Sequence, residues 1–311
     1  MPWRAQFVLL AAIWGSSFLF IKVLGEHWPA PWVALSRVAL GAATLVVITL
    51  IRREHVRFGD RRAWLHLTVV GVLYNVIPFT LFAYGEQHTS SIVAGLWNAT
   101  TPLWVLVAVL LVFDEERLSR DRAAGMLVGF AGVLLVLGPW RGLGHGELIG
   151  NLACAGAGLS YGISWPYTRR YLAGRPDSAL ALSAGQLLCA TAILAAIVPF
   201  AGAPTTHIGL KGVGSLLALG VLGTGVAYLL NYSIIRAAGA AVGSTVTYLI
   251  PVFSTALGVI VLKEPLSWNQ PVGAVVLITG IAVAQGRIRR ARGAETPAPA
   301  SPAAAHVGES G

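Results

Sequence analysis

The sequence predicts an all-α polytopic membrane protein with ten transmembrane helices arranged as two inverted five-helix repeats. Three observations lead to this fold class: the scarcity of charge, the number and length of the apolar segments, and an internal repeat. Hydrophobic residues make up 56% of the 311 residues and charged residues only 11%, whereas a soluble domain carries about 25% charged residues. So few charges could not cover a water-facing surface, and lipid is therefore the expected solvent.

Ten apolar segments are long enough to cross a bilayer. A spanning helix needs roughly 20 apolar residues, and each backbone amide in the hydrocarbon core must be hydrogen-bonded within its own segment. The first segment is expected to remain as an uncleaved span rather than a signal peptide, because no small-residue cleavage site follows it. The predicted spans are 5–23, 31–51, 64–84, 90–112, 122–139, 148–168, 178–200, 211–232, 240–262 and 268–287.

The distribution of Lys and Arg predicts the orientation. If the N-terminus is cytoplasmic, the inner segments hold 17 of the 22 basic residues and the outer segments hold four, while Arg37 lies within a span. Because inner loops are enriched in Lys and Arg, we expect a multi-pass protein of the plasma or inner membrane with both termini in the cytoplasm. The net charge of +9 is then a topology signal rather than a nucleic-acid signal. The tail 289–311, rich in Ala and Pro, is expected to be disordered.

An internal repeat joins the two halves of the chain. Gly71-Val72-Leu73 recurs as Gly220-Val221-Leu222 and Pro102 recurs as Pro251, both at a spacing of 149, and Glu116 recurs as Glu264 at a spacing of 148. Each unit holds five spans, an odd number, so the second copy must enter the membrane inverted. The predicted units are 1–146 and 147–288.

Inverted repeats are a plan of secondary transporters, with the substrate site near the membrane midplane between the halves. We therefore expect a small-molecule transporter that works by alternating access, a probable exporter by family analogy as described below. A duplication that only enlarged a bundle, a membrane scaffold or receptor, and a lipid-modifying membrane enzyme remain open alternatives. The spans hold no paired carboxylates, catalytic triad or CxxC motif, so no catalytic residue, cofactor or metal site is expected. Cys154 and Cys189 are interpreted as packing residues.

Polar and aromatic residues at mid-depth are the candidate substrate-binding residues. They share helical faces by their spacing of three, four or seven residues, and polar side chains are costly in lipid, so these faces should point inward. Such residues also bond neighbouring helices, and this alternative remains open for each of them. The candidates are Trp14, Ser17, Tyr74, Asn75, Trp97, Asn98, Thr101, Tyr161, Ser164, Trp165, Thr224, Tyr228, Asn231, Ser244, Thr247 and Tyr248.

Four further residues have specific expected roles. Pro102 and Pro251 each remove a helical hydrogen bond, so we expect kinks or hinges in the fourth and ninth spans. Arg37 and Lys22 are expected as charges at the outer mouth, where Arg37 could attract a carboxylate or, like Lys22, extend to the interface. The register pairs Arg37 with Ala184, so any role of Arg37 would be asymmetric. GxxxG pairs, such as 125/129 and 158/162, predict close helix packing.

No Asp or Glu falls in the middle of a predicted span. Proton-coupled carriers commonly use an intramembrane carboxylate or His. We therefore expect facilitated diffusion, exchange, or coupling through the charge of the substrate. The expected substrate is a neutral, zwitterionic or aromatic metabolite, and Arg37 leaves a carboxylate-bearing amino acid open.

Several motifs resemble the EamA family of the drug/metabolite transporter superfamily. Residues 14–18, Trp-Gly-Ser-Ser-Phe, followed by Lys22, resemble the opening helix of the family. Residues 116–119, Glu-Arg-Leu-Ser, resemble the signature between its fourth and fifth helices, and residues 263–267, Lys-Glu-Pro-Leu-Ser, are the second copy.

The resemblance implies a ten-helix fold with a central cavity lined by helices 1, 3, 4, 6, 8 and 9, with helices 5 and 10 peripheral. It also implies transport, by export, of small metabolites such as amino acids or drug-like compounds. The expected partners are a small-molecule substrate and the lipid bilayer but no nucleic acid, and a homodimer remains open.

Overall fold

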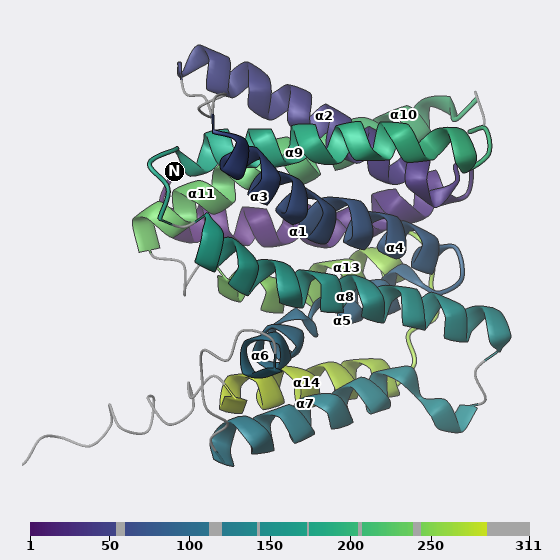
Figure 1. The fold of residues 1–311 in the computed structure, drawn as a ribbon. Helices are drawn as coiled ribbons and strands as arrows, with labels where there is room; N and C mark the ends of the chain where they lie inside the picture. The colour runs from purple at the N-terminus through teal and green to yellow at the C-terminus, as the bar shows by residue number, and fades with distance from the viewer. Residues whose placement is uncertain are drawn as a thin grey trace, which may run out of the picture.

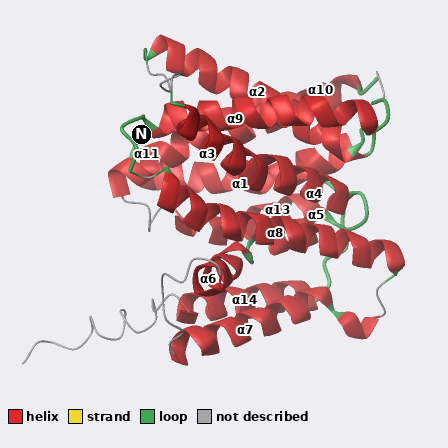
Figure 2. Cartoon of the chain, viewed as in Figure 1, coloured by secondary structure: helices red, strands yellow, loops and turns green. Residues whose placement is uncertain are grey.

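The chain is helical throughout the part that the computed structural model describes, which comprises residues 1–53, 60–111, 120–141, 144–172, 174–204, 207–238 and 244–284. Within these ranges there is no β-strand (Figure 2). Most helices run roughly along one common direction and pack side by side as a bundle, whereas α6 is seen nearly end-on (Figure 1).

The helices of the first half follow the predicted spans closely. The third span is one continuous helical segment with a π-helical stretch in its middle, and the fourth is divided in two. The elements are α1 (Trp3–Gly25), α2 (Ala30–Ile51), α3 (Arg61–Gly71), η1 (Val72–Val76), α4 (Ile77–Glu86), α5 (Ser91–Asn98), α6 (Thr101–Leu111), α7 (Arg120–Leu137) and η2 (Pro139–Arg141).

The third segment of the second half also contains a π-helical stretch, η4. The elements are α8 (His145–Tyr171), α9 (Ala179–Ile197), η3 (Val198–Phe200), α10 (Gly209–Leu217), η4 (Ala218–Val226), α11 (Ala227–Ala238), η5 (Ser244–Tyr248), α13 (Ile250–Ile260) and α14 (Asn269–Ala284).

Six helical segments in the described ranges are long and apolar enough to cross a membrane, and three more are apolar but shorter. The six are Trp3–Gly25, Ala30–Ile51, Arg61–Glu86, Ser91–Leu111, Ala179–Phe200 and Gly209–Ile235. The shorter ones are Ala123–Leu137, Val246–Ile260 and Asn269–Ala284. The 27-residue α8 falls in neither group, and many Gly and small polar residues lower its hydropathy. The structure thus shows a polytopic membrane protein.

The two prolines at equivalent places interrupt their helices. The fourth span breaks at Ala99–Thr100, immediately before Pro102, where α5 ends and α6 begins. The ninth span changes from the 3₁₀-helix η5 to α13 at Leu249, two residues before Pro251. Proline cannot donate the helical hydrogen bond and its ring crowds the preceding turn, which accounts for an interruption at each of these places.

Helices α7 and α14 pack against each other at the edge of the bundle, as the family resemblance implied (Figure 1). Glycines bring their backbones together: a Cβ on Gly125 would lie 2.3 Å from the backbone nitrogen of Ala284, and one on Gly280 would lie 2.3 Å from that of Gly129. Small residues allow such close approach in membranes. The predicted packing role of the GxxxG pair is therefore confirmed for this contact.

The other main contacts join helices of different halves. α2 packs on α9 and on η4, and α9 also packs on α3 and η1. α1 packs on α11 and α13, and α8 packs on α4 and α6. Exchanging each helix for its counterpart 147 to 149 residues away leaves the α2–α9 contact unchanged and turns α2–η4 into α9–η1. It also turns the contacts of α1 with α11 and α13 into those of α8 with α4 and α6. The centre of the bundle is therefore built from both halves of the chain.

Charged side chains tie helix ends together outside this centre. The Glu264 carboxylate accepts hydrogen bonds from the backbone nitrogen and the hydroxyl of Ser91, both at 2.8 Å, and from the backbone nitrogen of Ile92 at 3.2 Å. It thus caps the start of α5, where free amides favour an anion. The first copy of this motif, residues 116–119, lies outside the described residues.

Candidate functional site

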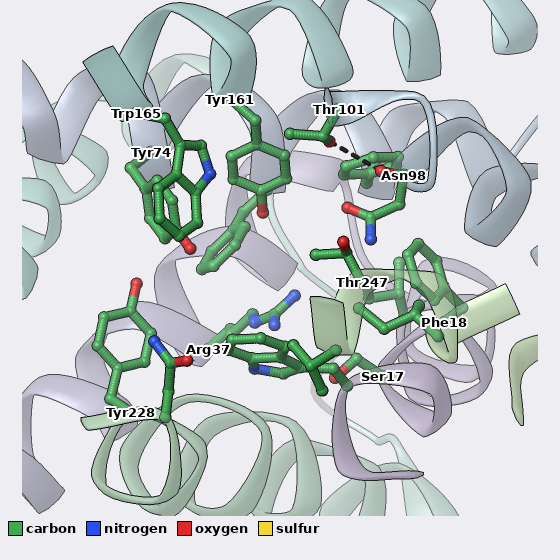
Figure 3. A pocket seen from close by; sticks show the side chains of 17 residues that line it. Ser17, Phe18, Arg37, Tyr74, Asn98, Thr101, Tyr161, Trp165, Tyr228 and Thr247 are labelled. Carbon is green, nitrogen blue, oxygen red and sulfur yellow. Dashed lines mark hydrogen bonds between the residues drawn. The ribbon is translucent and has the colours of Figure 1, made fainter. Parts of the chain in front are cut away.

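A central cavity lies between the two halves (Figure 3). Its walls come from α1, α2, η1, α4, α5, α6, α8, α11, η5 and α13. The lining residues are Trp14, Ser17, Phe18, Ile21, Arg37, Tyr74, Phe79, Phe82, Asn98, Thr101, Tyr161, Trp165, Tyr228, Asn231, Val246, Thr247 and Ile250. The six helices that the resemblance implied all contribute, and Arg37 adds a seventh.

Ten of the predicted substrate-binding candidates line this cavity. They come from six different helical segments, and only the fold brings them together. They are Trp14, Ser17, Tyr74, Asn98, Thr101, Tyr161, Trp165, Tyr228, Asn231 and Thr247.

Five candidates lie behind the wall instead and bond other parts of the protein. The Trp97 indole donates to Asn151 at 2.8 Å, and the Ser164 hydroxyl donates to the carbonyl of Tyr161 at 2.9 Å. Asn75 and Thr224 are fully buried, and Tyr248 packs against an apolar cluster around Trp97. For Trp97, Asn75 and Thr224 the structure thus shows bonds to neighbouring helices, whereas the Ser164 bond stays within α8. The side chain of Ser244 lies outside the described residues.

The apolar part of the lining was not predicted. Phe18, Ile21, Phe79 and Phe82 face the cavity together with Val246 and Ile250. Residue polarity cannot distinguish an apolar side chain that lines a cavity from an apolar side chain that faces lipid. Helical spacing carried a usable signal, because Phe18 and Ile21 follow Trp14 at four and seven residues, on one face.

Aromatic side chains form one side of the cavity. The Tyr74 ring lies 5.0 Å from that of Tyr161, 6.4 Å from that of Tyr228 and 6.2 Å from that of Trp165, measured between centroids. The hydroxyls of Tyr161 and Tyr228 point into the open space (Figure 3). Such rings offer apolar area with a polar tip, so they can hold a ligand of mixed polarity.

Arg37 lies in the cavity wall rather than at an outer mouth. Its side chain is buried, its Nε donates to the hydroxyl of Thr224 at 3.1 Å, and its guanidinium carbon lies 3.9 Å from the centre of the Phe79 ring. The guanidinium points into the middle of the cavity (Figure 3). The side chain therefore does not extend to a membrane interface. Arg37 is the one charged residue of the lining among the residues described.

A second polar contact across the halves corresponds to that of Arg37. The Gln186 amide donates to Asn75 Oδ1 at 2.6 Å, and the Asn75 amide donates to the Tyr228 hydroxyl at 3.2 Å. Gln186 lies 149 residues after Arg37, and Thr224 lies 149 residues after Asn75. The contacts thus place Gln186, rather than the Ala184 expected from the register, in the position equivalent to Arg37.

Lys22 does not line the cavity. Its ammonium donates to the backbone carbonyls of Glu86 and Thr89, which are freed where α4 ends. Glu86 lies beyond the predicted span 64–84, but in the structure it is the last residue of α4 and is 1% exposed. Neither of its carboxyl oxygens has a hydrogen-bond partner among the residues that the structure describes.

Nothing in the described part of the chain suggests a metal site: no group of three or more His, Cys, Asp or Glu side chains could hold an ion there. Cys154 and Cys189 are both free thiols. Apolar helices long enough to cross a bilayer, packed around one cavity with polar and aromatic walls, define a polytopic membrane protein of the transporter class.

Comparison with known proteins gives the family. The chain belongs to the EamA-like transporter family, whose model matches residues 2–138 and 148–285. An uncharacterized transporter of Archaeoglobus fulgidus is 25% identical over 276 residues, which cover 88% of this chain and 95% of the relative. The uncharacterized inner membrane transporter YedA of Escherichia coli is 28% identical over 291 residues, which cover 90% of this chain and 91% of YedA.

Two further comparisons agree with this assignment. An uncharacterized protein of Pseudomonas aeruginosa is 33% identical over 254 residues, which cover 79% of this chain and 81% of the relative. A solved crystal structure aligns with a TM-score of 0.62 and 22% identity, covering 93% of this chain and 98% of the other, and this likeness shows the fold. The resemblance to the EamA family is confirmed, and the family and the names of the relatives point to transport rather than catalysis.

Proposed function

We propose that this protein carries small metabolites, such as amino acids or drug-like compounds, across the cell membrane by alternating access, in the direction of export. The observation that carries the proposal is the central cavity, whose walls come from both halves of the chain. A ligand held there is bound by two units at once, so a change in their relative packing alters its exposure to the two sides.

The proposed topology has ten spans in two inverted repeats, 1–146 and 147–288, with both termini and the tail 289–311 in the cytoplasm. Two structural features support it. The contacts between helices exchange in pairs when the halves are exchanged, and π-helical segments occur at Val72–Val76 and Ala218–Val226, at corresponding places. The excess of Lys and Arg in the proposed inner loops supports the orientation.

A flux assay with a matched tyrosine pair tests the transport function. In proteoliposomes, Tyr161→Ala is expected to reduce flux of a transported solute severalfold or more, because Tyr161 lines the cavity. Tyr84→Ala removes a tyrosine that is 39% exposed on α4 and absent from the lining, so it should keep the wild-type flux. Equal flux in both variants, or no flux of any metabolite by the wild-type protein, would contradict the proposal.

Cysteine labelling tests alternating access separately. In a background without Cys154 and Cys189, a cysteine replacing Thr247 should react with a membrane-impermeant thiol reagent from each side in turn as solute gradients are reversed. Leu127→Cys, at a 73% exposed position on the peripheral helix α7, should stay unlabelled because lipid covers it. Labelling of Thr247→Cys from one side under every condition would count against alternating access.

A further inference from the structure

We propose that Arg37 is the anion-recognition residue of the cavity and that the ligand it selects is a small organic carboxylate with one negative charge and an apolar or aromatic body. This inference rests on the proposed transport function, since it names the class of solute that the same cavity takes. It starts from the unused hydrogen-bond donors of Arg37.

A guanidinium carries five N–H donors and no acceptor. In this structure Nε is directed to Thr224, at 3.1 Å, and this is the single hydrogen bond of the Arg37 side chain within the described residues. No carboxylate lies within ion-pair distance of it in the same part of the chain. The terminal nitrogens face the cavity (Figure 3), so the side of the fork that suits a carboxylate is available to a ligand.

The equivalent contact in the other half shows how a purely structural group is satisfied. Gln186 donates to Asn75 at 2.6 Å, and Asn75 in turn donates to Tyr228. Gln186 does not line the cavity. A neutral amide with bonded neighbours therefore suffices to join the helices at this position. The charge of Arg37 exceeds what this helix contact requires, and a buried charge is costly unless it is paired.

The surroundings hold the fork in place for a partner. The Phe79 ring lies 3.9 Å from the guanidinium carbon, a cation–π contact that stabilises the charge without using an N–H group. Thr224 fixes Nε from the opposite half of the chain. A guanidinium that is already oriented loses little freedom when it binds a carboxylate through two parallel hydrogen bonds.

The rest of the lining limits the ligand to one negative charge. The lining contains no second cation and no acidic residue. A phosphate dianion would therefore keep an unpaired charge in the cavity, and the ammonium group of an amino acid would meet only neutral acceptors and aromatic faces. Tyr74, Tyr161 and Trp165 supply an apolar wall for the body of the ligand.

A thermal-shift experiment with matched ligands tests the inference. Purified protein in detergent is heated with 3-phenylpropionate, with its neutral amide 3-phenylpropanamide, and with zwitterionic phenylalanine, within a wider panel of aromatic and aliphatic carboxylates and their amides. Ligands that bind the folded state raise the melting temperature. We expect the carboxylates to bind about tenfold to hundredfold more tightly than the amides, the range for hydrogen bonds to a charged group, with zwitterions between them.

Variants connect this selectivity to Arg37. Arg37→Gln should abolish the preference for carboxylates, and Arg37→Lys, which keeps the charge but loses the fork, should reduce it. Arg175→Gln removes the same charge from a loop far from the lining and should leave the preference unchanged. Because the amide comparison needs only the wild-type protein, the test remains decisive if Arg37→Gln does not fold.

The outcomes separate this inference from the proposed function. Equal shifts with carboxylates and amides, or a carboxylate preference that survives in Arg37→Gln, would overturn the role of Arg37 while leaving transport intact. In proteoliposomes the same result would appear as flux of neutral compounds that does not depend on Arg37. If the wild-type protein neither binds nor moves any compound of the panel, the carboxylate class itself is wrong, and an absence of flux for every metabolite contradicts the transport function as well.

Discussion

The contact of Arg37 with Thr224 and the contact of Gln186 with Asn75 are built in the same way and differ in charge. In each, a side chain from the second helix of one half reaches the π-helical segment of the other half, at 3.1 Å in the first case and 2.6 Å in the second. One donor is a cation that also faces the cavity. The other is a buried amide at the start of a chain of hydrogen bonds that runs through Asn75 to Tyr228.

This difference shows how a nearly symmetric fold can hold an asymmetric site. The helix contacts fix where the two side chains lie, and the residue type at each position decides whether the cavity receives charge. If the halves exchange their conformations during transport, the positive charge stays with the first half. The two states that open to opposite sides of the membrane therefore present different electrostatic surfaces to the ligand.

Moving charge to the neutral contact should have the largest effect. In Gln186→Arg a guanidinium would enter a buried site where the backbone of Gly71 packs closely on that of Gln186. We expect a loss of about 3–5 kcal/mol of folding free energy, the usual cost of an unpaired buried charge, measured by unfolding in detergent. A loss below about 1 kcal/mol, close to the effect of an ordinary surface substitution, would show that packing at this site does not exclude a charged side chain.

Removing the acceptors of the two contacts should have unequal effects. Asn75→Leu eliminates two hydrogen bonds and leaves the buried amide of Gln186 without an acceptor, so we expect a loss of about 1–3 kcal/mol. Thr224→Val eliminates one acceptor of a guanidinium that still faces the cavity, and should cost about 1 kcal/mol or less. Unfolding measurements on both variants decide this order, and a larger loss in Thr224→Val would reverse our view of the two contacts.

The smallest effect concerns a contact between the halves outside the spans. Arg175 donates to Asp60 at 2.6 Å, and this bond lowers the pKa of the Asp60 carboxyl. Since the ordinary pKa is about 3.9, the bond stabilises the fold above that pH, and the stabilisation disappears as the pH falls through the lowered pKa. Asp60→Asn should therefore lower the melting temperature slightly at pH 7 and have no effect at the acid end. A difference that persists unchanged in acid would contradict the ion pair.

Much of the fold could be predicted because hydropathy, glycine and proline act locally. The break before Pro102 follows from the residue type itself, and Gly125 and Gly129 indicate a close helix contact without identifying α14 as the partner. The π-helical segments could not be predicted, since an additional residue in a turn leaves no compositional sign. Nor could the register of α2 against α9, which depends on packing between segments far apart in the sequence and places Gln186 opposite Arg37.

The site was predictable to the extent that polarity marks a cavity. Tyr161 and Thr247 were found because polar groups avoid lipid. Trp97 and Asn75 have the same chemistry, but their partners, Asn151 and Gln186, come from other helices, and only the assembled bundle reveals that those bonds are made. Phe79 was not among the predicted residues, because its hydropathy does not indicate that it contacts the Arg37 guanidinium.

The capping of α5 by Glu264 has a consequence for biosynthesis. Ser91 emerges from the ribosome 173 residues before Glu264, whose carboxylate caps the start of α5. α7 is likewise synthesised before α14, the helix that packs against it. During translation the first half therefore inserts with a helix start that only Ser90 caps and with an uncovered glycine face. We expect this nascent half to need protection in the membrane until the last helix arrives, and a chain severed between residues 142 and 147 to mature only when both pieces are made together.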